Sequence, residues 1–287
     1  MKPTKIQLIS VLILLFGTAN AQTNFEPDST LIYKTTVQGD LKMKVFKPSS
    51  HFITDHRPAI IFFFGGGWSG GNTKQFYQQA RVFADSGYVA ISAEYRVRGK
   101  HKTSPFECVT DGKSAIRYLR THADNLGIDP NKIIASGASA GGHVAACTGI
   151  INNFEEADEN LKISSIPNAL ILFNPVTDTT EKGYGMDKVG ENRKTEISPN
   201  HHVVKGIPPT LIFHGTADTT VPFENVERFT KLMTEAGNIC QLVPFDGKRH
   251  GFFNGSYFRK RGNDKIFNRT MNLSFEFLEK LNFQTID

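Results

Sequence analysis

The stretch that most constrains the fold is residues 132–147, which read KIIASGASAGGHVAAC. A short β-branched run leads into Gly137, Ser139 and Gly141, and small apolar residues suited to a buried helix follow. This order predicts a strand, a sharp turn and a helix, with a serine at the apex. A serine raised on a strained turn leaves no room for side chains where strand and helix approach each other, which explains both glycines. The turn is therefore a candidate nucleophile elbow, although glycine and serine also fill ordinary loops and helix caps.

Apolar segments alternate with amphipathic ones on both sides of this turn. Residues 59–64 form a continuous apolar run of the kind that is buried on both faces of a sheet. Shorter strands are expected at residues 88–92, 169–173, 210–213 and 240–243, and helices at residues 73–86, 106–125, 224–236 and 265–281. Residues 31–46 alternate around Gln38-Gly39-Asp40 and predict an antiparallel hairpin. The pattern indicates an α/β fold, a mostly parallel sheet with helices on both faces and the hairpin at one edge.

The first 21 residues differ in kind from the rest of the chain. Lys2 and Lys5 precede an apolar run, and Ala19-Asn20-Ala21 fits the small-residue rule for signal peptidase. We expect a signal peptide cleaved after Ala21 and a secreted or periplasmic protein. A membrane anchor is the alternative, but the apolar run is short for a bilayer and no later segment is apolar for long enough to cross one. Residues 22–287 suit a single catalytic domain, in which residues 174–208 are polar and form a candidate cap or lid.

The charge and the cysteines exclude several functions. Loss of two lysines with the signal would lower the net charge from +5 to +3, and the basic residues are spread along the chain. Nucleic-acid binding therefore has little support, and the Arg259-Lys260-Arg261 run is expected to be a solvated loop. Three cysteines match no metal motif. We favour buried thiols over a disulfide between Cys108 and Cys147.

Polar residues occupy the carboxyl ends of three expected strands, which is where ligands bind in such a sheet. Ser139 follows one strand, Asp218 follows the strand at 210–213, and His250 follows the strand at 240–243. The chain order is Ser, Asp, His, with intervals of 79 and 32 residues. His250 would accept the proton of the weakly nucleophilic serine, and Asp218 would orient the imidazole. The sequence thus predicts a catalytic triad rather than a helix cap and a loop histidine.

Other acids and histidines were weighed for the same roles. Asp246 lies only four residues before His250, and Asp178 follows the strand at 169–173, so both are weaker candidates for the acid. His214 is expected to brace a loop. His143 on the elbow helix and the pair at 201–202 are expected to have local structural roles.

A glycine run predicts where the oxyanion of a tetrahedral intermediate would bind. The N–H groups of Gly66 and Gly67, together with that of Ala140 beside the nucleophile, are the expected donors. A phosphate cradle is the alternative for such a run, but no Gly-Lys-Ser/Thr follows. Trp68, the only tryptophan, either packs beneath this loop or lines the substrate pocket.

These residues resemble the α/β-hydrolases, in particular the secreted esterase and lipase-like group with a His-Gly-Gly-Gly oxyanion motif. The resemblance covers nearly the whole chain after residue 21: it includes the glycine loop, the Tyr95-Arg96 pair, the helix with Asp111, the elbow and both remaining triad segments. Phe64 departs from the pattern, because the family often has histidine there.

The resemblance implies a serine esterase that forms an acyl-enzyme without a metal or organic cofactor. It further implies a small-molecule or polysaccharide ester as substrate, with acetyl groups on carbohydrate such as xylan as our expectation. The alternatives are a lipase, a prolyl-oligopeptidase-like peptidase, for which residues before Leu31 are too few to form a propeller, and a catalytically silent binding protein. The natural ester, its acyl length and the oligomeric state do not follow from the sequence.

Overall fold

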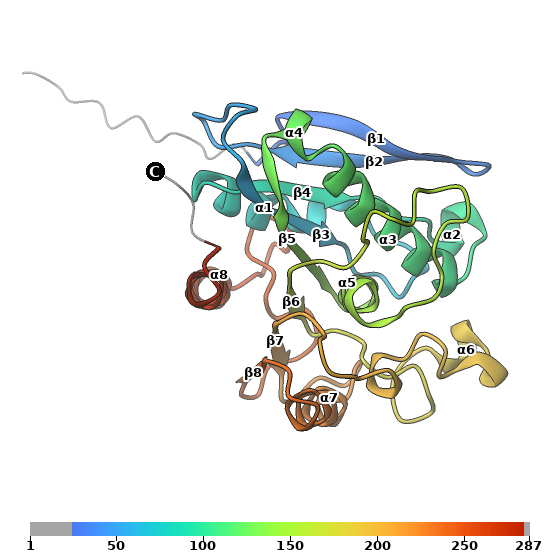
Figure 1. Cartoon of the computed structure of the whole chain (residues 1–287). Helices are drawn as coiled ribbons and strands as arrows, with labels where there is room; N and C mark the ends of the chain where they lie inside the picture. Colours follow the sequence, from blue (N-terminus) through green and yellow to red (C-terminus); the bar gives the residue numbers. More distant parts are fainter. Residues whose placement is uncertain (1–24, 284–287) are drawn as a thin grey trace, which may run out of the picture.

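One eight-stranded sheet organises the computed structural model, which describes residues 25–283 (Figure 1). The strand order is β1-β2-β4-β3-β5-β6-β7-β8. The pairs β1–β2 and β2–β4 are antiparallel and the others are parallel. The predicted mostly parallel sheet with an N-terminal hairpin at its edge is confirmed. The expected signal peptide lies outside the described residues.

The elements have the following bounds. The strands are β1 (Ser29–Thr36), β2 (Gly39–Phe46), β3 (Arg57–Phe63), β4 (Val89–Ala93), β5 (Ile128–Ala138), β6 (Ala169–Phe173), β7 (Thr210–Gly215) and β8 (Cys240–Phe245). The helices are α1 (Tyr77–Asp85), α2 (Arg98–His101), α3 (Pro105–Thr121), α4 (Ala123–Leu126), α5 (Ala140–Ile150), α6 (Met186–Val189), α7 (Phe223–Glu235) and α8 (Asp264–Lys280). Short 3₁₀ turns are η1 (Thr73–Phe76), η2 (Glu191–Arg193) and η3 (Pro199–His201).

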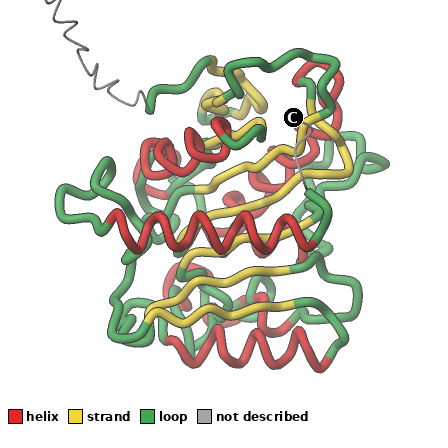
Figure 2. Tube along the Cα trace, turned by 90° about the vertical axis from the view of Figure 1, so that its left-hand side faces the viewer, coloured by secondary structure: helices red, strands yellow, loops and turns green. Residues whose placement is uncertain are grey.

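The sheet has a hydrophobic layer on each face, as expected for strands that are apolar on both sides. On one face, Phe83 of α1 and Phe267 of α8 share a buried cluster with Phe62. On the other face, α3, α5 and α7 cover a second buried cluster that includes Ile61 and Phe63 of β3. Figure 2 shows the strands side by side with helices packed along them. This sandwich places the carboxyl ends of the central parallel strands at one edge.

Two predicted helices differ from the structure at their ends. Residues 73–86 are a 3₁₀ turn followed by α1, and the side chain of Asn72 accepts from the Lys74 N–H and caps the first turn. Residues 106–125 are divided into α3 and α4 at His122. Helix α3 begins with a capping box in which the Glu107 carboxylate accepts from the Ser104 N–H at 2.8 Å.

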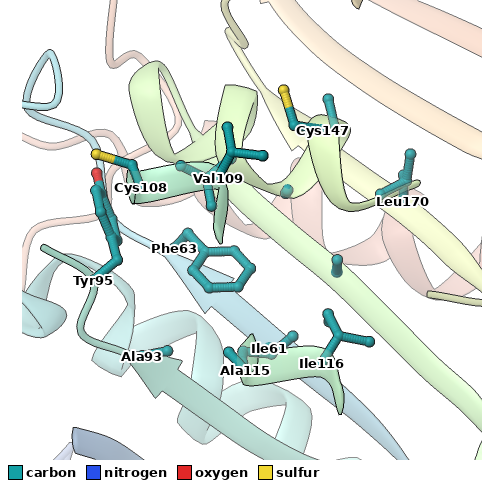
Figure 3. Close-up of a cluster of buried hydrophobic side chains, with 14 of the residues drawn as sticks. Ile61, Phe63, Ala93, Tyr95, Cys108, Val109, Ala115, Ile116, Cys147 and Leu170 are labelled. Carbon is teal, nitrogen blue, oxygen red and sulfur yellow. The ribbon is translucent and has the colours of Figure 1, made fainter. Parts of the chain in front are cut away.

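The cysteine thiols are free. Cys108 and Cys147 are buried and Cys240 is half-buried. Figure 3 shows Cys108 and Cys147 on separate parts of the core around Phe63. The favoured prediction of buried thiols over a disulfide therefore matches the structure. Within residues 25–283, no helix has both the length and the apolar character needed to span a bilayer.

Candidate active site

The turn between β5 and α5 holds Ser139 at a positive φ, with φ 55° and ψ −121°. Such a backbone is strained for a residue with a side chain and is typical of functional sites. A Cβ on Gly141 would lie 2.1 Å from the Phe63 carbonyl oxygen, and one on Gly137 would lie 2.4 Å from the Gly141 oxygen. Neither distance is sterically allowed, so the turn requires both glycines.

Ser139, His250 and Asp218 meet at the carboxyl edge of the sheet. The Ser139 Oγ lies 2.9 Å from the His250 Nε2, and the His250 Nδ1 lies 2.6 Å from an Asp218 carboxylate oxygen. They follow β5, β8 and β7, respectively. Ser139 and Asp218 are each only 8% exposed. The three residues that the sequence selected thus form one continuous hydrogen-bonded chain.

The Asp218 carboxylate is held in its ionised form by several donors. Burial opposes ionisation, but hydrogen bonds from His214, His250 and the Val221 N–H outweigh it and lower the pKa of Asp218 well below its usual value. The N–H groups of Thr220 and Val221 donate to one carboxylate oxygen at 2.8 and 3.0 Å. The other carboxylate oxygen lies beside the Nδ1 of His250 and the Nε2 of His214. The carboxylate can therefore orient His250 and stabilise its charged form.

The alternative acids lie elsewhere. Asp246 accepts from the Thr216 hydroxyl at 3.2 Å, and the buried Asp178 pairs with Arg228. The Nε2 of His214 lies 3.0 Å from the Val221 carbonyl oxygen, which agrees with the predicted loop-bracing role.

The other histidines that were weighed for the site contact groups away from the Ser139 hydroxyl. The Nε2 of His143 lies 2.6 Å from the Ile197 carbonyl oxygen. His201 and His202 bond to Ser198 and Thr195 within their own segment. None of these histidines contacts the Ser139 hydroxyl among the described residues.

The glycine loop after β3 leaves backbone donors free beside Ser139. Gly66 and Gly67 have φ values of 140° and 60°, which favour glycine. Within residues 25–283, neither of their N–H groups has a protein acceptor, whereas the Gly65 N–H donates to the Gln75 side chain at 2.6 Å. Ala140 is the first residue of α5, so its N–H has no acceptor within the helix. The three expected donors are thus available to a ligand.

The base of the glycine loop is braced by Tyr95, which follows β4. The Tyr95 hydroxyl donates to the Phe64 carbonyl oxygen at 2.6 Å, and its ring stacks on that of Phe64 at a centroid distance of 4.3 Å. Arg96, the next residue, forms an ion pair with the buried Asp111 of α3 at 2.8 Å. Phe64 stands where the family often has histidine. Its ring stacks on Tyr95, and its carbonyl oxygen accepts a hydrogen bond from the same tyrosine.

Ser139 opens into a cavity of about 360 Å³. Its wall combines glycine backbone with aromatic, amide and cationic side chains: Gly65, Gly66, Gly67, Gly71, Asn72, Gln75, Ala138, Asn174, Tyr184, Thr220, His250, Gly251, Phe253, Phe258 and Arg259. Trp68 does not line this cavity. It is 1% exposed and packs edge-on against His143 at 5.0 Å, which corresponds to the packing alternative for this residue.

Several wall residues were not selected from the sequence. Asn174 directly follows β6, its side-chain oxygen accepts from the Gly251 N–H at 3.0 Å, and its nitrogen lies 3.5 Å from the His250 Nε2. Its position directly after a strand could have identified it as a candidate site residue from the sequence. Tyr184 lies in an irregular segment without such a signal. Arg259 was expected in a solvated loop, yet it borders the cavity. The described residues contain no cluster of histidine, cysteine or carboxylate side chains suited to a metal ion.

Comparison with known proteins identifies the family. The BD-FAE family model matches residues 43–233. The chain belongs to the BD-FAE family. The match includes Ser139 and Asp218 but ends before His250.

Several of the sequence relatives are named as esterases. Esterase LipC of Mycobacterium tuberculosis is 28% identical over 219 residues, which cover 69% of this chain and 54% of that protein. Acetylxylan esterase of Xylanibacter ruminicola is 28% identical over 217 residues, which cover 70% of this chain and 42% of that protein. The chain thus spans about half the length of such relatives.

Solved structures agree over nearly the whole chain. The apo form of Thermogutta terrifontis esterase 2 has a TM-score of 0.86 and 44% identity, and covers 92% of this chain and 98% of its own. A propionate-bound form has a TM-score of 0.85 and 43% identity, with the same coverage. These likenesses place this BD-FAE member among the α/β-hydrolases and support the predicted enzyme class, a carboxylic ester hydrolase.

Proposed function

We propose that this protein hydrolyses carboxylic esters of short acyl acids through an acyl-enzyme on Ser139. The observation that carries the proposal is the continuous chain from the Ser139 Oγ through His250 to Asp218, at 2.9 and 2.6 Å, which opens on a cavity beside free backbone donors. A serine hydroxyl becomes an effective nucleophile only where a base can take its proton. The esterase relatives support the same reaction class.

In the proposed mechanism, the Ser139 Oγ attacks the ester carbonyl carbon while the His250 Nε2 takes the hydroxyl proton. The carbonyl oxygen becomes an oxyanion that accepts hydrogen bonds from the N–H groups of Gly66, Gly67 and Ala140. The imidazolium then gives its proton to the leaving alcohol, and the acyl group stays on Ser139. Water repeats the steps with His250 as base, which releases the acid and restores the serine. Asp218 stabilises the imidazolium in both halves.

Substitutions at the triad test the mechanism. Ser139→Ala or His250→Ala should lower kcat for p-nitrophenyl acetate by about a millionfold, with the melting temperature retained. Asp218→Asn should lower kcat by about 10⁴-fold. Asp246→Asn is the matched control, since Asp246 follows the same strand as His250 and, among the described residues, its carboxylate bonds only to Thr216. Full activity in Ser139→Ala, or a larger loss in Asp246→Asn than in Asp218→Asn, would refute the assignment.

We further propose acetyl groups on carbohydrate as the natural substrate. The small cavity, with Tyr184, Phe253 and Phe258 in its wall, suits short acyl groups. The similar Thermogutta esterase binds propionate, and one relative is an acetylxylan esterase. The test is a series of p-nitrophenyl esters from acetyl to dodecanoyl, alongside acetylated xylan. The proposal expects kcat/KM to fall with chain length and acetate to be released from xylan. A preference for long chains would favour the lipase alternative, and no turnover of any ester would favour a binding protein.

Secretion and the domain assignment remain part of the proposal. Residues 1–21 carry the composition of a cleaved signal, and residues 22–287 form the catalytic domain, in which residues 174–208 cap the cavity. N-terminal sequencing of the protein from the external fraction of an expressing bacterium should begin at Gln22. Recovery of an intact N-terminus from the cytosol would contradict secretion.

A further inference from the structure

The segment 174–208 reaches the glycine loop through two side chains. The Lys188 Nζ lies 3.3 Å from the Gly67 carbonyl oxygen and 2.9 Å from the Tyr184 hydroxyl. Lys188 is on the short helix α6, and Tyr184 lies one turn before it. The ammonium group therefore links the cap segment directly to the glycine whose N–H faces no protein acceptor among the described residues.

The same two side chains occupy the space beside the Gly67 α-carbon. A Cβ on Gly67 would lie 2.7 Å from the Tyr184 hydroxyl and 2.9 Å from the Lys188 Nζ. Gly67 has φ 60°, a conformation that glycine adopts without cost but also leaves freely. A run of three glycines has no side chains of its own to restrict it. The orientation of its peptide groups must therefore be fixed by neighbours.

Other contacts hold different parts of the loop. Tyr95 and Gln75 fix the Phe64 carbonyl and the Gly65 N–H, and the Gly66 carbonyl accepts from the N–H groups of Ser69 and Gly70. For the Gly67 carbonyl, Lys188 Nζ and the Ser69 hydroxyl are the donors within residues 25–283. Lys188 is the donor that comes from outside the loop.

Lys188 is also held in place without an acidic partner. In the described part of the chain, no carboxylate lies within 4.0 Å of its ammonium group, which sits 4.7 Å from the Tyr184 ring centroid and 5.9 Å from that of Trp68. Cation–π contacts of this kind stabilise an ammonium group and limit its motion. Its hydrogen-bonding capacity is thus directed to the Gly67 carbonyl and the Tyr184 hydroxyl.

We propose that Lys188, supported by Tyr184, is a positioning residue for oxyanion binding. By holding the carbonyl and the α-carbon of Gly67, it limits rotation about the φ and ψ bonds of that glycine and so helps to fix the Gly66–Gly67 peptide, whose N–H is the proposed donor. The inference rests on the proposed function, because it acts on a donor of the proposed oxyanion site. A fixed donor stabilises the transition state without reorganisation, whereas a mobile one must be ordered during the reaction. Loss of the contact between Lys188 and the Gly67 carbonyl should therefore reduce kcat far more than it changes KM.

The test compares Lys188→Met, Lys188→Arg and Tyr184→Phe with wild type on p-nitrophenyl acetate. Lys188→Met keeps the length and apolar stem but removes the donor, so kcat should fall about 10- to 100-fold, less than for outright loss of an oxyanion donor. KM should change less than about threefold, since ground-state binding is retained. Lys188→Arg should restore most of the activity, and Tyr184→Phe should cause a smaller loss. Lys182→Met, an exposed lysine in the same segment, is the matched control and should match wild type.

A second readout separates positioning from a general structural role. A short alkyl trifluoromethyl ketone forms a tetrahedral adduct with a serine hydroxyl and places an oxyanion in the site. Its affinity should fall in Lys188→Met by the same factor as kcat/KM, with the melting temperature unchanged. If kcat is unchanged in Lys188→Met while Ser139→Ala is inactive, the positioning role of Lys188 is overturned and the serine mechanism stands. A loss of kcat with unchanged inhibitor affinity would also overturn that role. Full activity in Ser139→Ala would instead refute the proposed function.

Discussion

The buried histidine of α5 should make stability depend on pH in a defined window. His143 lies one turn after Ser139 on α5 and is fully buried. Its Nε2 contacts the Ile197 carbonyl oxygen at 2.6 Å and the Cys147 sulfur at 3.4 Å, and its ring packs against Trp68. No carboxylate lies within 4.0 Å of the ring among the described residues. Burial lowers the pKa of His143 from 6.5 to about 4, although the carbonyl contact opposes the change.

The sign and size of the effect follow from the two pKa values. Above pH 6.5 the histidine is neutral in both the folded and the unfolded chain. Between pH 6.5 and about 4 the unfolded chain binds the proton and the folded chain does not, so the free energy of unfolding falls as the pH falls. The pKa difference of about 2.5 corresponds to about 3 kcal/mol over the whole window, and to about 2 kcal/mol between pH 7 and pH 5. That is a large part of the stability of a typical domain.

The assay is urea unfolding of wild type and His143→Gln, followed by far-UV circular dichroism at pH 7, 6 and 5. Glutamine retains an N–H donor near the Ile197 carbonyl but does not titrate. Its substitution will have a cost of its own at pH 7, so the informative quantity is the change with pH. Other titrating groups, including the half-buried His51 and the buried His101, are common to both proteins. We expect wild type to lose about 2 kcal/mol more than His143→Gln between pH 7 and pH 5. Parallel losses in the two proteins would refute the reasoning.

Two further predictions concern stability. In α5, Gly141→Ala should destabilise by about 2 kcal/mol or more, because its Cβ would lie 2.1 Å from a β3 carbonyl oxygen. Gly149→Ala in the same helix meets its nearest atom at 3.3 Å and should change stability by less than about 1 kcal/mol; thermal unfolding of both variants checks this, and equal effects would contradict it. Glu155→Gln should cost about 3 kcal/mol in urea unfolding, since it leaves Lys113, only 1% exposed, without its partner. The exposed ion pair of Glu181 with Lys194 is the control, and Glu181→Gln should cost far less than Glu155→Gln; an equal loss would show that burial of the ion pair is irrelevant.

The sheet and the three hydrogen-bonded residues could be predicted because each depends on short-range patterns and one topological rule. Ser139, Asp218 and His250 each follow an apolar run by a few residues, and parallel strands bring their carboxyl ends to one edge. Lys188 and Tyr184 could not be selected in this way. They lie in a segment of loops and very short helices, whose path is set by tertiary packing rather than by periodicity or turn chemistry. Their relation to Gly67 spans more than 100 residues and depends on distances of about 3 Å that no local pattern encodes.

The support of the glycine loop illustrates the same limit and adds a functional consequence. The sequence noted both Phe64 and Tyr95, but the hydrogen bond between them joins residues 31 apart and depends on how β3 and β4 are paired. Burial raises the pKa of the Tyr95 hydroxyl well above its usual value of 10.0. This hydroxyl therefore remains protonated and donates to the Phe64 carbonyl across the whole range in which an esterase operates. A histidine at position 64 could titrate within that range, whereas the contacts between Phe64 and Tyr95 hold the glycine loop independently of pH.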